Sequence, residues 1–319
     1  MKKSMCLVGF LCLGIICCQQ ENIPDTTCTD NSFLINLEAS ACLEDIQTLL
    51  TVASLYEENI ETKRLIEVNG IPNHPVGKFP NRGNPNAIAL VAQNYSMETN
   101  PNTANMTTSG QGYTFGVLFS GVTLDPYTAE FFTSSSGQIN RNWNITALTS
   151  TYDLGLDCNN GHVQPTGKYH YHGTPSAMLA ALDNGGVEMI RVGFAADGFP
   201  IYYKYAHVNG SLQAVQSGYQ LKKGFRPGDG NIAPDGCYDG TYFQDYEFVE
   251  NLSPLDACNG MLGKTPASDE EYFYLITDNF PSSPLCFTGT PDASFRNQPN
   301  RNDSQGHHHI LFYPSALTE

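Results

Sequence analysis

Three histidines in segment 158–175, CNNGHVQPTGKYHYHGTP, have a spacing that suits a metal ion. His170 and His172 are two residues apart, so in an extended strand both imidazoles project from the same face. His162 precedes them across the turn-forming stretch 165–167, which can fold the chain back and bring a third imidazole beside the pair. Three imidazoles on one strand-turn-strand unit can hold Zn²⁺ or Cu²⁺ with a position left for water.

The competing interpretation is a set of hydrogen-bonded core histidines, with Tyr169 and Tyr171 packing on the opposite face. Three histidines at this spacing, beside glycines that let backbone and ligand approach closely, favour the metal site. No thiolate or methionine accompanies them, which argues against a blue-copper site. Since neutral imidazole is the ligand, we expect metal affinity to fall below about pH 6.5.

Two acidic residues are candidates for handling a proton at this site. Asp197, in AADGFPIYY after an apolar strand, is either a carboxylate ligand or general base, or the first residue of an Asp-Gly turn. Glu130, in DPYTAEFF, can orient a ligating imidazole, although a lone acid between aromatic residues is more often structural. The sequence contains no Gly-x-Ser-x-Gly elbow, P-loop or dinucleotide fingerprint that would indicate another chemistry.

Other histidines are weaker candidates. His74 lies between prolines, which predicts a loose surface position. His307, His308 and His309 are followed by ILFYPSALTE, so we interpret them as native residues and as a minor option for joining the site.

The histidine segment also carries a family resemblance. GHVQPTGKYHYHGTP, with AADGFPIYY further on, resembles the YHYH-domain proteins, a bacterial family named for this tetrapeptide. The resemblance covers roughly residues 69–291. The family name records a sequence pattern, so the resemblance implies no particular reaction. The segments that carry it are 161–175, 195–203, 69–86, 119–132 and 255–287.

A weak internal repeat predicts a domain built in two parts. LDCNNG at 156–161 is similar to LDACNG at 255–260. In the family the second copy often continues to another histidine-bearing strand, whereas here the strand at 271–280, EYFYLITDNF, has no histidine. We therefore expect the chemistry in the first copy.

The N-terminus predicts export. Two lysines precede an apolar run at residues 5–16, which is typical of a secretory signal and too short to span a membrane. The run ends in a pattern that resembles a lipobox and predicts a lipid on Cys18. Cys17 as the acceptor, or an ordinary signal peptide, are the alternatives. We expect a signal peptide over 1–17, a tether over 18–31, and a bacterial envelope location outside the cytoplasm.

The charge of the chain excludes one class of partner. The net charge is −16, and it becomes −18 once residues 1–17, with two lysines and no acids, are removed. Nucleic acid needs the opposite sign, so we expect none. A small molecule or glycan remains possible as a partner, since Trp143 and the many tyrosines offer stacking surface.

Six cysteines follow Cys18, an even number that predicts disulfides in an oxidising compartment. Fifteen pairings are possible. The expected pairs each close a local loop, and the last lies in family-like segments: Cys28 with Cys42, Cys158 with Cys237, and Cys258 with Cys286.

The pattern of the remaining chain predicts a mainly β protein. We expect a single β-rich domain with long loops over 63–319, with β-prone runs at 113–119, 187–194 and 272–276. Apolar residues at helical intervals predict an amphipathic helical segment over 32–62. A short helix is predicted from Ser176 to Leu182, with Thr174 as its cap.

Two functions follow from these patterns. The first is an envelope lipoprotein that binds a metal or a glycan without turnover. The second is a metal-dependent hydrolase or oxidase, using Zn or Cu, in which Asp197 or Glu130 handles the proton. The first is favoured because no general base stands out.

Overall fold

The computed structural model describes residue 28 and residues 33–44, 55–182 and 184–297. The predicted signal peptide, most of the tether, Cys18 and the histidines at 307–309 lie outside these residues. Among the residues described, no helix combines the length and apolar character needed to cross a membrane.

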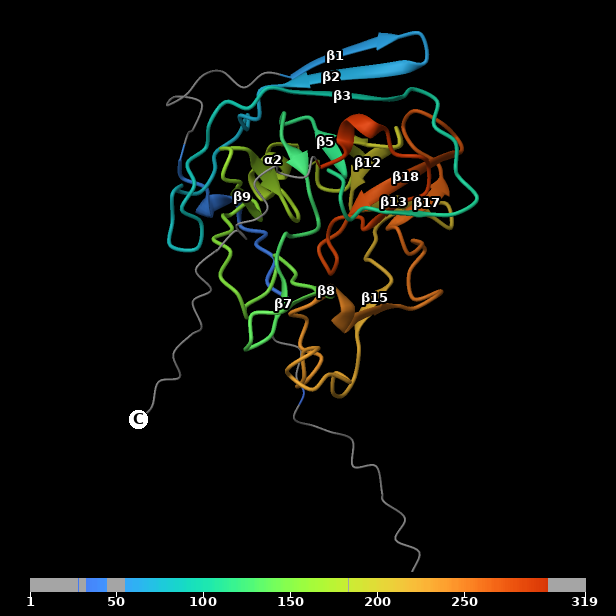
Figure 1. Ribbon diagram of the computed structural model, residues 1–319. Coiled ribbons are helices and arrows are strands. Elements are labelled where there is room, and N and C mark those ends of the chain that lie inside the picture. The colour runs from blue at the N-terminus through green and yellow to red at the C-terminus, as the bar shows by residue number, and fades with distance from the viewer. Residues whose placement is uncertain (1–27, 29–32, 45–54, 183, 298–319) are drawn as a thin grey trace, which may run out of the picture.

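An eight-stranded sheet forms the centre of the fold (Figure 1). Neighbouring strands pair antiparallel, except that β6 with β10 and β12 with β18 are parallel. Most strand residues are buried, which confirms the mainly β prediction and explains the apolar and aromatic runs in the sequence. The spatial order is β17 (Gly260–Gly263), β18 (Glu271–Ile276), β12 (Pro200–Tyr203), β11 (Ile190–Ala195), β5 (Gly116–Leu118), β6 (Thr123–Leu124), β10 (Tyr169–Tyr171) and β9 (Gly161–Val163).

The sheet consists of two halves that have the same arrangement of strands. In each half a hairpin, β5–β6 or β11–β12, pairs in parallel with the second strand of a later hairpin, β9–β10 or β17–β18. At the centre β5 lies antiparallel to β11, and Val117 faces Phe194. A pseudo-two-fold axis through this pair relates the halves. The axis matches residue pairs on neighbouring strands: Gly116 opposite Leu124 corresponds to Gly193 opposite Ile201. Likewise, Leu124 opposite Tyr171 corresponds to Ile201 opposite Tyr274.

The same hydrogen-bonded corner precedes the later hairpin in each half, so the internal repeat predicted from LDCNNG and LDACNG is structural. The Asp157 carboxylate accepts hydrogen bonds from the backbone N–H groups of Asn159 and Gly161, at 2.9 and 3.2 Å. It also accepts the hydroxyl of Tyr169 at 2.8 Å. The second half repeats these contacts with Asp256, which accepts from Cys258, Gly260 and Tyr272 at 2.8, 3.0 and 2.8 Å.

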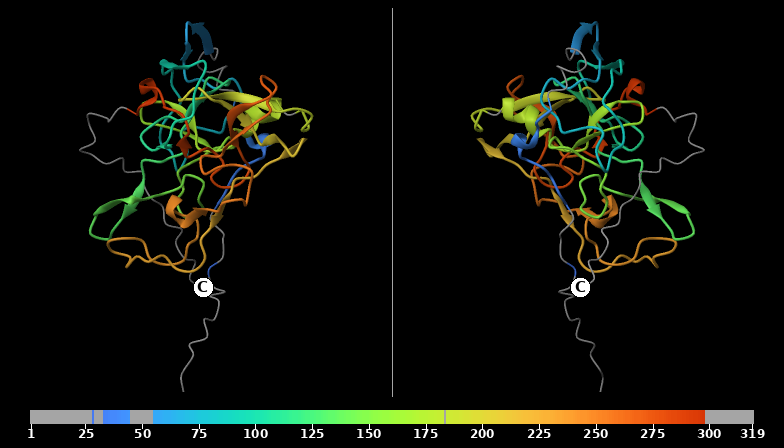
Figure 2. Two further views of the ribbon diagram at one scale, coloured as in Figure 1. Left: turned by 90° about the vertical axis from the view of Figure 1, so that its right-hand side faces the viewer. Right: turned by 90° about the vertical axis from the view of Figure 1, so that its left-hand side faces the viewer.

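Smaller elements surround this sheet. A three-stranded sheet crosses one end of the molecule (Figure 1), and the β7–β8 hairpin projects from its side (Figure 2). The three-stranded sheet is β1 (Leu55–Ile60), β2 (Lys63–Val68) and β3 (Gln93–Glu98). The two-stranded pairs are β7 (Phe131–Thr133) with β8 (Ile139–Asn144), β13 (Tyr205–Val208) with β14 (Ser211–Ala214), β15 (Tyr219–Leu221) with β16 (Tyr246–Phe248), and β19 (Cys286–Phe287) with β4 (Thr108–Ser109). The helical elements are α2 (Ser176–Leu182) and three 3₁₀ turns, η1 (Ala39–Ala41), η2 (Phe243–Asp245) and η3 (Ala293–Phe295).

The amphipathic helix predicted over 32–62 is wrong wherever the structure describes that range. Residues 33–44, called here the strap, run extended with one 3₁₀ turn, and β1 occupies Leu55–Ile60. Outside its 3₁₀ turn the strap has backbone partners in other segments, since Leu34 donates to the Leu148 carbonyl and Asn36 exchanges hydrogen bonds with the Asn160 side chain. These contacts override the helical spacing of its apolar residues. Residues 45–54 lie outside the described part.

The short helix is confirmed at Ser176–Leu182, but its cap differs from the prediction. The side-chain oxygen of Asn159 accepts from the N–H of Ala177 at 2.8 Å. The Thr174 hydroxyl instead contacts the Thr277 carbonyl and Ser282 Oγ. The residue that satisfies the helix start therefore lies far back in the chain, where a local capping rule cannot find it.

The six cysteines that follow Cys18 all form disulfides, but two predicted pairs are wrong. Cys258–Cys286 is confirmed, whereas the other pairs are Cys28–Cys237 and Cys42–Cys158. The loops these two close span 209 and 116 residues, so the preference for local loops misled the prediction. Because the strap lies across the histidine segment, Cys42 is brought to Cys158.

The Cys42–Cys158 disulfide should contribute strongly to stability. Changing both residues to serine should lower the free energy of unfolding by about 2 to 5 kcal/mol, measured by urea denaturation, because the bridge restricts a long loop of the unfolded chain. The matched Cys258→Ser, Cys286→Ser variant opens a loop of only 28 residues and should lose about 1 kcal/mol less on the chain-entropy model. Peptide mapping without reduction that recovers Cys28 joined to Cys42 would contradict this pairing.

Candidate metal centre

The β9–β10 hairpin places the three histidines on one face, as predicted. His162 lies directly opposite His170 in the antiparallel register. In the connecting turn the Gln164 N–H donates to the Lys168 oxygen and the Gly167 N–H donates to the Gln164 oxygen, each at 2.8 Å. Gly167 adopts φ +89°, a conformation that favours glycine. Alternation along β10 then puts the next histidine, His172, beside the pair and sends the two tyrosines into the main core.

The three imidazoles converge through the same ring atom. Nε2 of His172 lies 3.0 Å from Nε2 of His170 and 3.0 Å from Nε2 of His162. One ligand atom from each of the three lies within 4.8 Å of the others, and all three residues are buried. Two nitrogens bound to one Zn²⁺ at about 2.0 to 2.1 Å are about 3.3 Å apart in a tetrahedron, so the cluster fits a single ion.

A backbone carbonyl fixes the tautomer of one ring. Nδ1 of His162 lies 2.9 Å from the Leu154 oxygen, whereas Nδ1 of His172 lies 3.5 Å from the Pro126 oxygen, which is long for a hydrogen bond. Because a carbonyl oxygen only accepts, Nδ1 of His162 carries the proton, which leaves a lone pair on Nε2 of the neutral ring. That Nε2 lies 3.0 Å from Nε2 of His172, so its lone pair is available to a cation shared by the rings.

Burial makes a proton a poor choice for that cation. Desolvation lowers the pKa of His172 to about 4 and the pKa of His170 well below its ordinary 6.5. The neighbouring rings and the Lys168 ammonium lower the pKa of His170 further. The rings of His170 and His172 are therefore neutral at pH 7, and we expect protons to displace a metal from them at a lower pH than the 6.5 expected from the sequence.

A buried carboxylate beside the cluster was missed in the sequence. Asp125 follows β6, which pairs in parallel with β10, and its backbone N–H donates to the Tyr171 oxygen at 2.8 Å. Its carboxylate accepts from the Lys168 ammonium at 3.2 Å. It also opposes the effect of burial on the pKa of His172. Only the non-local pairing of β6 with β10 brings Asp125 here, so no local spacing could reveal it.

One of the histidines borders a small cavity. His172 contributes to its wall, together with Phe33 of the strap and residues that include Leu148, Phe243 and Phe280. The cavity measures about 10 Å³, which is about the space of one water molecule. Phe33 packs edge-on against Phe280 at 5.8 Å, so the strap forms part of this wall.

Asp197 does not belong to the histidine cluster that the structure forms. It lies in an Asp-Gly turn between β11 and β12, where its carboxylate accepts from the Tyr274 hydroxyl at 2.6 Å and from the Gly289 N–H at 2.9 Å. The pseudo-two-fold axis matches it to Ser120, which contacts the Tyr171 hydroxyl at 2.9 Å. The turn interpretation of Asp197 therefore describes its position, and burial raises its pKa to about 6.

The other sequence candidates are also placed. Glu130 is half-buried, and its backbone oxygen accepts from Ile145 and Asn144 at the base of the β7–β8 hairpin. Trp143 is partly exposed and packs edge-on against Tyr242 at 5.6 Å.

His74 is not a loose surface residue, because it is only 7% exposed. Its Nδ1 donates to the Pro75 oxygen at 2.9 Å, and its Nε2 accepts from the Tyr171 hydroxyl at 2.5 Å. Burial lowers its pKa to about 4. His74 therefore supports the histidine strand from the tyrosine face.

The second half of the sheet has no histidine at the matching positions. Its hairpin registers place Met261, Phe273 and Leu275 where the first half has His162, His170 and His172. Phe273 and Leu275 are fully buried in an apolar cluster against which Met261 packs. The same hairpin therefore forms with apolar side chains in place of the histidines. Histidines occur at these positions only in the first copy, where we expect the chemistry.

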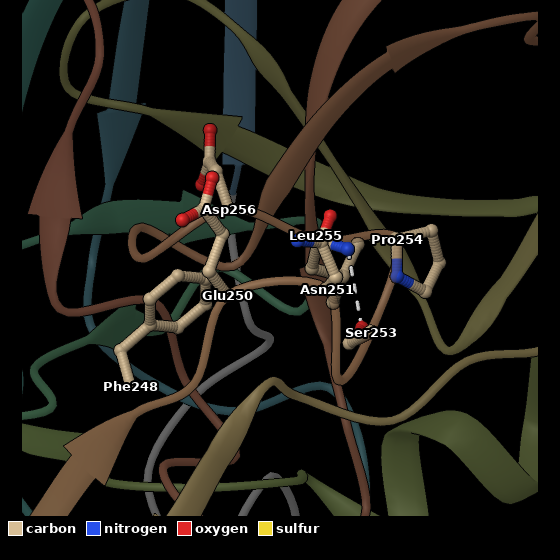
Figure 3. A pocket seen from close by; sticks show the side chains of 7 residues that line it. All are labelled: Phe248, Glu250, Asn251, Ser253, Pro254, Leu255 and Asp256. Carbon is tan, nitrogen blue, oxygen red and sulfur yellow. Dashed lines mark hydrogen bonds between the residues drawn. The ribbon is translucent and has the colours of Figure 1, made fainter.

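A larger cleft lies elsewhere and shares no lining residue with the histidine cluster. It measures about 550 Å³ and combines an aromatic ring with acidic and amide side chains (Figure 3). Asp256, the corner aspartate of the second half, lies on its wall, and there the Ser253 hydroxyl accepts from the Leu255 N–H at 3.1 Å. The lining residues are Phe248, Glu250, Asn251, Ser253, Pro254, Leu255 and Asp256.

The fold and the cluster define a β-rich protein with a buried site of three imidazoles that can hold a metal ion. The family model of the YHYH protein matches residues 94–289, more than half of the chain. The chain belongs to the YHYH family. The match includes both halves of the central sheet and all three histidines, while the strap lies outside it. No curated protein and no solved structure matches the chain.

Asp197→Asn should change how stability depends on pH. Because the folded pKa of about 6 lies above the ordinary 3.8, this carboxyl favours folding below about pH 4, and the contribution is lost as the pH rises through 6. Asparagine does not ionise, so the variant should gain up to about 3 kcal/mol relative to wild type between pH 4 and pH 7. Urea unfolding at a series of pH values measures this. A difference between the two proteins that is constant over that range would contradict the buried carboxyl.

Proposed function

We propose that the protein binds one divalent transition metal, Zn²⁺ or Cu²⁺, through Nε2 of His162, His170 and His172. The observation that carries the proposal is the convergence of three buried imidazoles, with Nε2 of His172 at 3.0 Å from Nε2 of both other rings. Imidazole nitrogens suit both ions, and the hydrogen bond of His162 to the Leu154 carbonyl is the outer contact that ligating histidines usually make.

A binding role is better supported than turnover. The three histidines are 7%, 3% and 3% exposed, and the cavity beside His172 has room for about one water. A site that acts on a hydrolysable substrate needs an open position that the substrate can reach. Neither Asp197 nor Glu130 belongs to the group of close metal-ligating atoms, which contains only the histidines among the described residues. We therefore place metal-dependent hydrolysis or oxidation second.

The setting of this binding protein is, in our proposal, the bacterial cell envelope. The apolar run at residues 5–16, followed by Cys17 and Cys18, supports export and lipid attachment. Three disulfides in the described part of the chain agree with an oxidising compartment.

Metal analysis of the protein purified without a histidine tag tests the site. Wild type should hold one Zn²⁺ or Cu²⁺ per chain after dialysis, and His170→Ala or His172→Ala should abolish stoichiometric binding. Alanine at His307 or His308 should leave most of it. Full binding by the double variant His170→Ala, His172→Ala, or none by wild type with either ion, would leave only the interpretation as structural histidines.

The second half of the sheet supplies a matched control for folding. The variant His162→Met, His170→Phe, His172→Leu carries the residues that fill the same positions there, so it should fold and bind no metal. Its circular dichroism should match that of wild type. This separates loss of the ligands from loss of the fold.

Lipid attachment is tested separately. Cys18→Ser should abolish incorporation of labelled palmitate and release the protein from the membrane fraction, because the thiol is the proposed acceptor. Cys17→Ser should keep most of the label. Equal labelling of wild type and both variants would reject Cys18 as the sole acceptor.

A further inference from the structure

We propose that Asp125 is a positioning residue for the metal: its carboxylate compensates the charge of the bound ion from outside the ring of ligands. This inference rests on the proposed metal binding by the three histidines. It assigns a role to a buried acid that the ligand set itself does not use.

Strand pairing puts Asp125 on the face that carries the histidines. In the parallel register of β6 and β10, Thr123 lies opposite His170, and the N–H of Asp125 donates to the Tyr171 oxygen. Alternation along both strands then turns the Asp125 side chain to the same side as His172. The carboxylate is not among the atoms close enough to complete the ligand group, so it acts at the second layer of contacts.

One oxygen of the Asp125 carboxylate has no hydrogen-bond partner. The residue is 6% exposed. Oδ2 accepts from the Lys168 ammonium at 3.2 Å and contacts the Thr123 hydroxyl at 3.5 Å. Oδ1 is buried and has no hydrogen-bond partner. A buried carboxylate with an unsatisfied oxygen is costly unless a nearby positive charge offsets it.

Neutral imidazoles carry no negative charge, so three of them cannot offset the charge of a divalent ion. A metal held by them alone keeps its full charge of +2 in a buried site, which is unfavourable. Asp125 offers a negative charge on this face, close enough to His172 to raise the pKa of its ring. The ion and the carboxylate therefore stabilise each other, with Lys168 balancing the carboxylate when no ion is bound.

The second half of the sheet provides an internal comparison. The pseudo-two-fold axis matches Asp125 to Tyr202 and Lys168 to Glu271. Tyr202 is buried in the apolar cluster that replaces the histidines. The buried acid thus occurs in the half that has the histidines and is absent from the matching position in the half that lacks them.

The test is Zn²⁺ affinity by competition with a chromophoric chelator, and the visible absorption of the Co²⁺-loaded protein. Asp125→Asn should weaken Zn²⁺ binding by about 10- to 100-fold and shift the Co²⁺ bands, because the charge near the ligands is lost. Lys168→Met should tighten Zn²⁺ binding, since it frees the carboxylate from its competing cation.

The double variant Asp125→Asn, Lys168→Met separates an electrostatic from a structural role. If Asp125 acts on the ion, the double variant should bind Zn²⁺ about 10- to 100-fold more weakly than Lys168→Met, with circular dichroism like that of wild type. If the double variant binds as tightly as Lys168→Met, the variant Asp125→Asn had failed through an unpaired Lys168, and the inference is overturned. Wild-type protein that binds neither Zn²⁺ nor Cu²⁺ overturns the proposed function itself. Equal Zn²⁺ affinity of wild type and Asp125→Asn overturns only the role of Asp125.

Discussion

The hydrogen-bonded corner at Asp157 sets the position of everything at the candidate metal centre. One carboxylate holds the turn amides and the Tyr169 hydroxyl, and so fixes the register in which His162 meets His170. A slip of one residue in that register would turn the histidines of β10 to the opposite face of the sheet. The imidazoles converge because the strand register and the hydrogen-bonded turn fix the backbone around them.

The duplicated sheet shows that this architecture does not depend on a metal. The second half builds the same corner with Asp256 and the same hairpin, yet fills its interior with Phe273 and Leu275. The first half replaces these apolar side chains with histidines and accepts the cost of buried polar groups. Polar residues at positions where apolar ones pack well in the other half support the proposal that these histidines bind a metal.

The sequence was most informative where the determinants are local. Alternation in the YHYH segment predicted the shared face of His170 and His172, and the turn at 165–167 predicted the return of His162. What could not be predicted depends on distant pairing: the β6–β10 contact brings in Asp125, and the strap brings Cys42 to Cys158. The helical spacing in the strap failed for the same reason, because Leu34 and Glu44 form backbone hydrogen bonds with other segments. Asp197 resembled a catalytic acid because a turn residue after a buried strand looks the same in both roles.

The Cys28–Cys237 disulfide limits how the domain can sit on a membrane. With a lipid on Cys18, as proposed, only nine residues lie between the anchor and this crosslink, and this connection spans at most about 35 Å when fully extended. The loop that contains Cys237 would then be held close to the lipid surface, and it exposes Phe225 and Ile232. The domain would then have one preferred orientation relative to the membrane. It would also stay in a thin layer above the bilayer, where cations gather near the anionic headgroups.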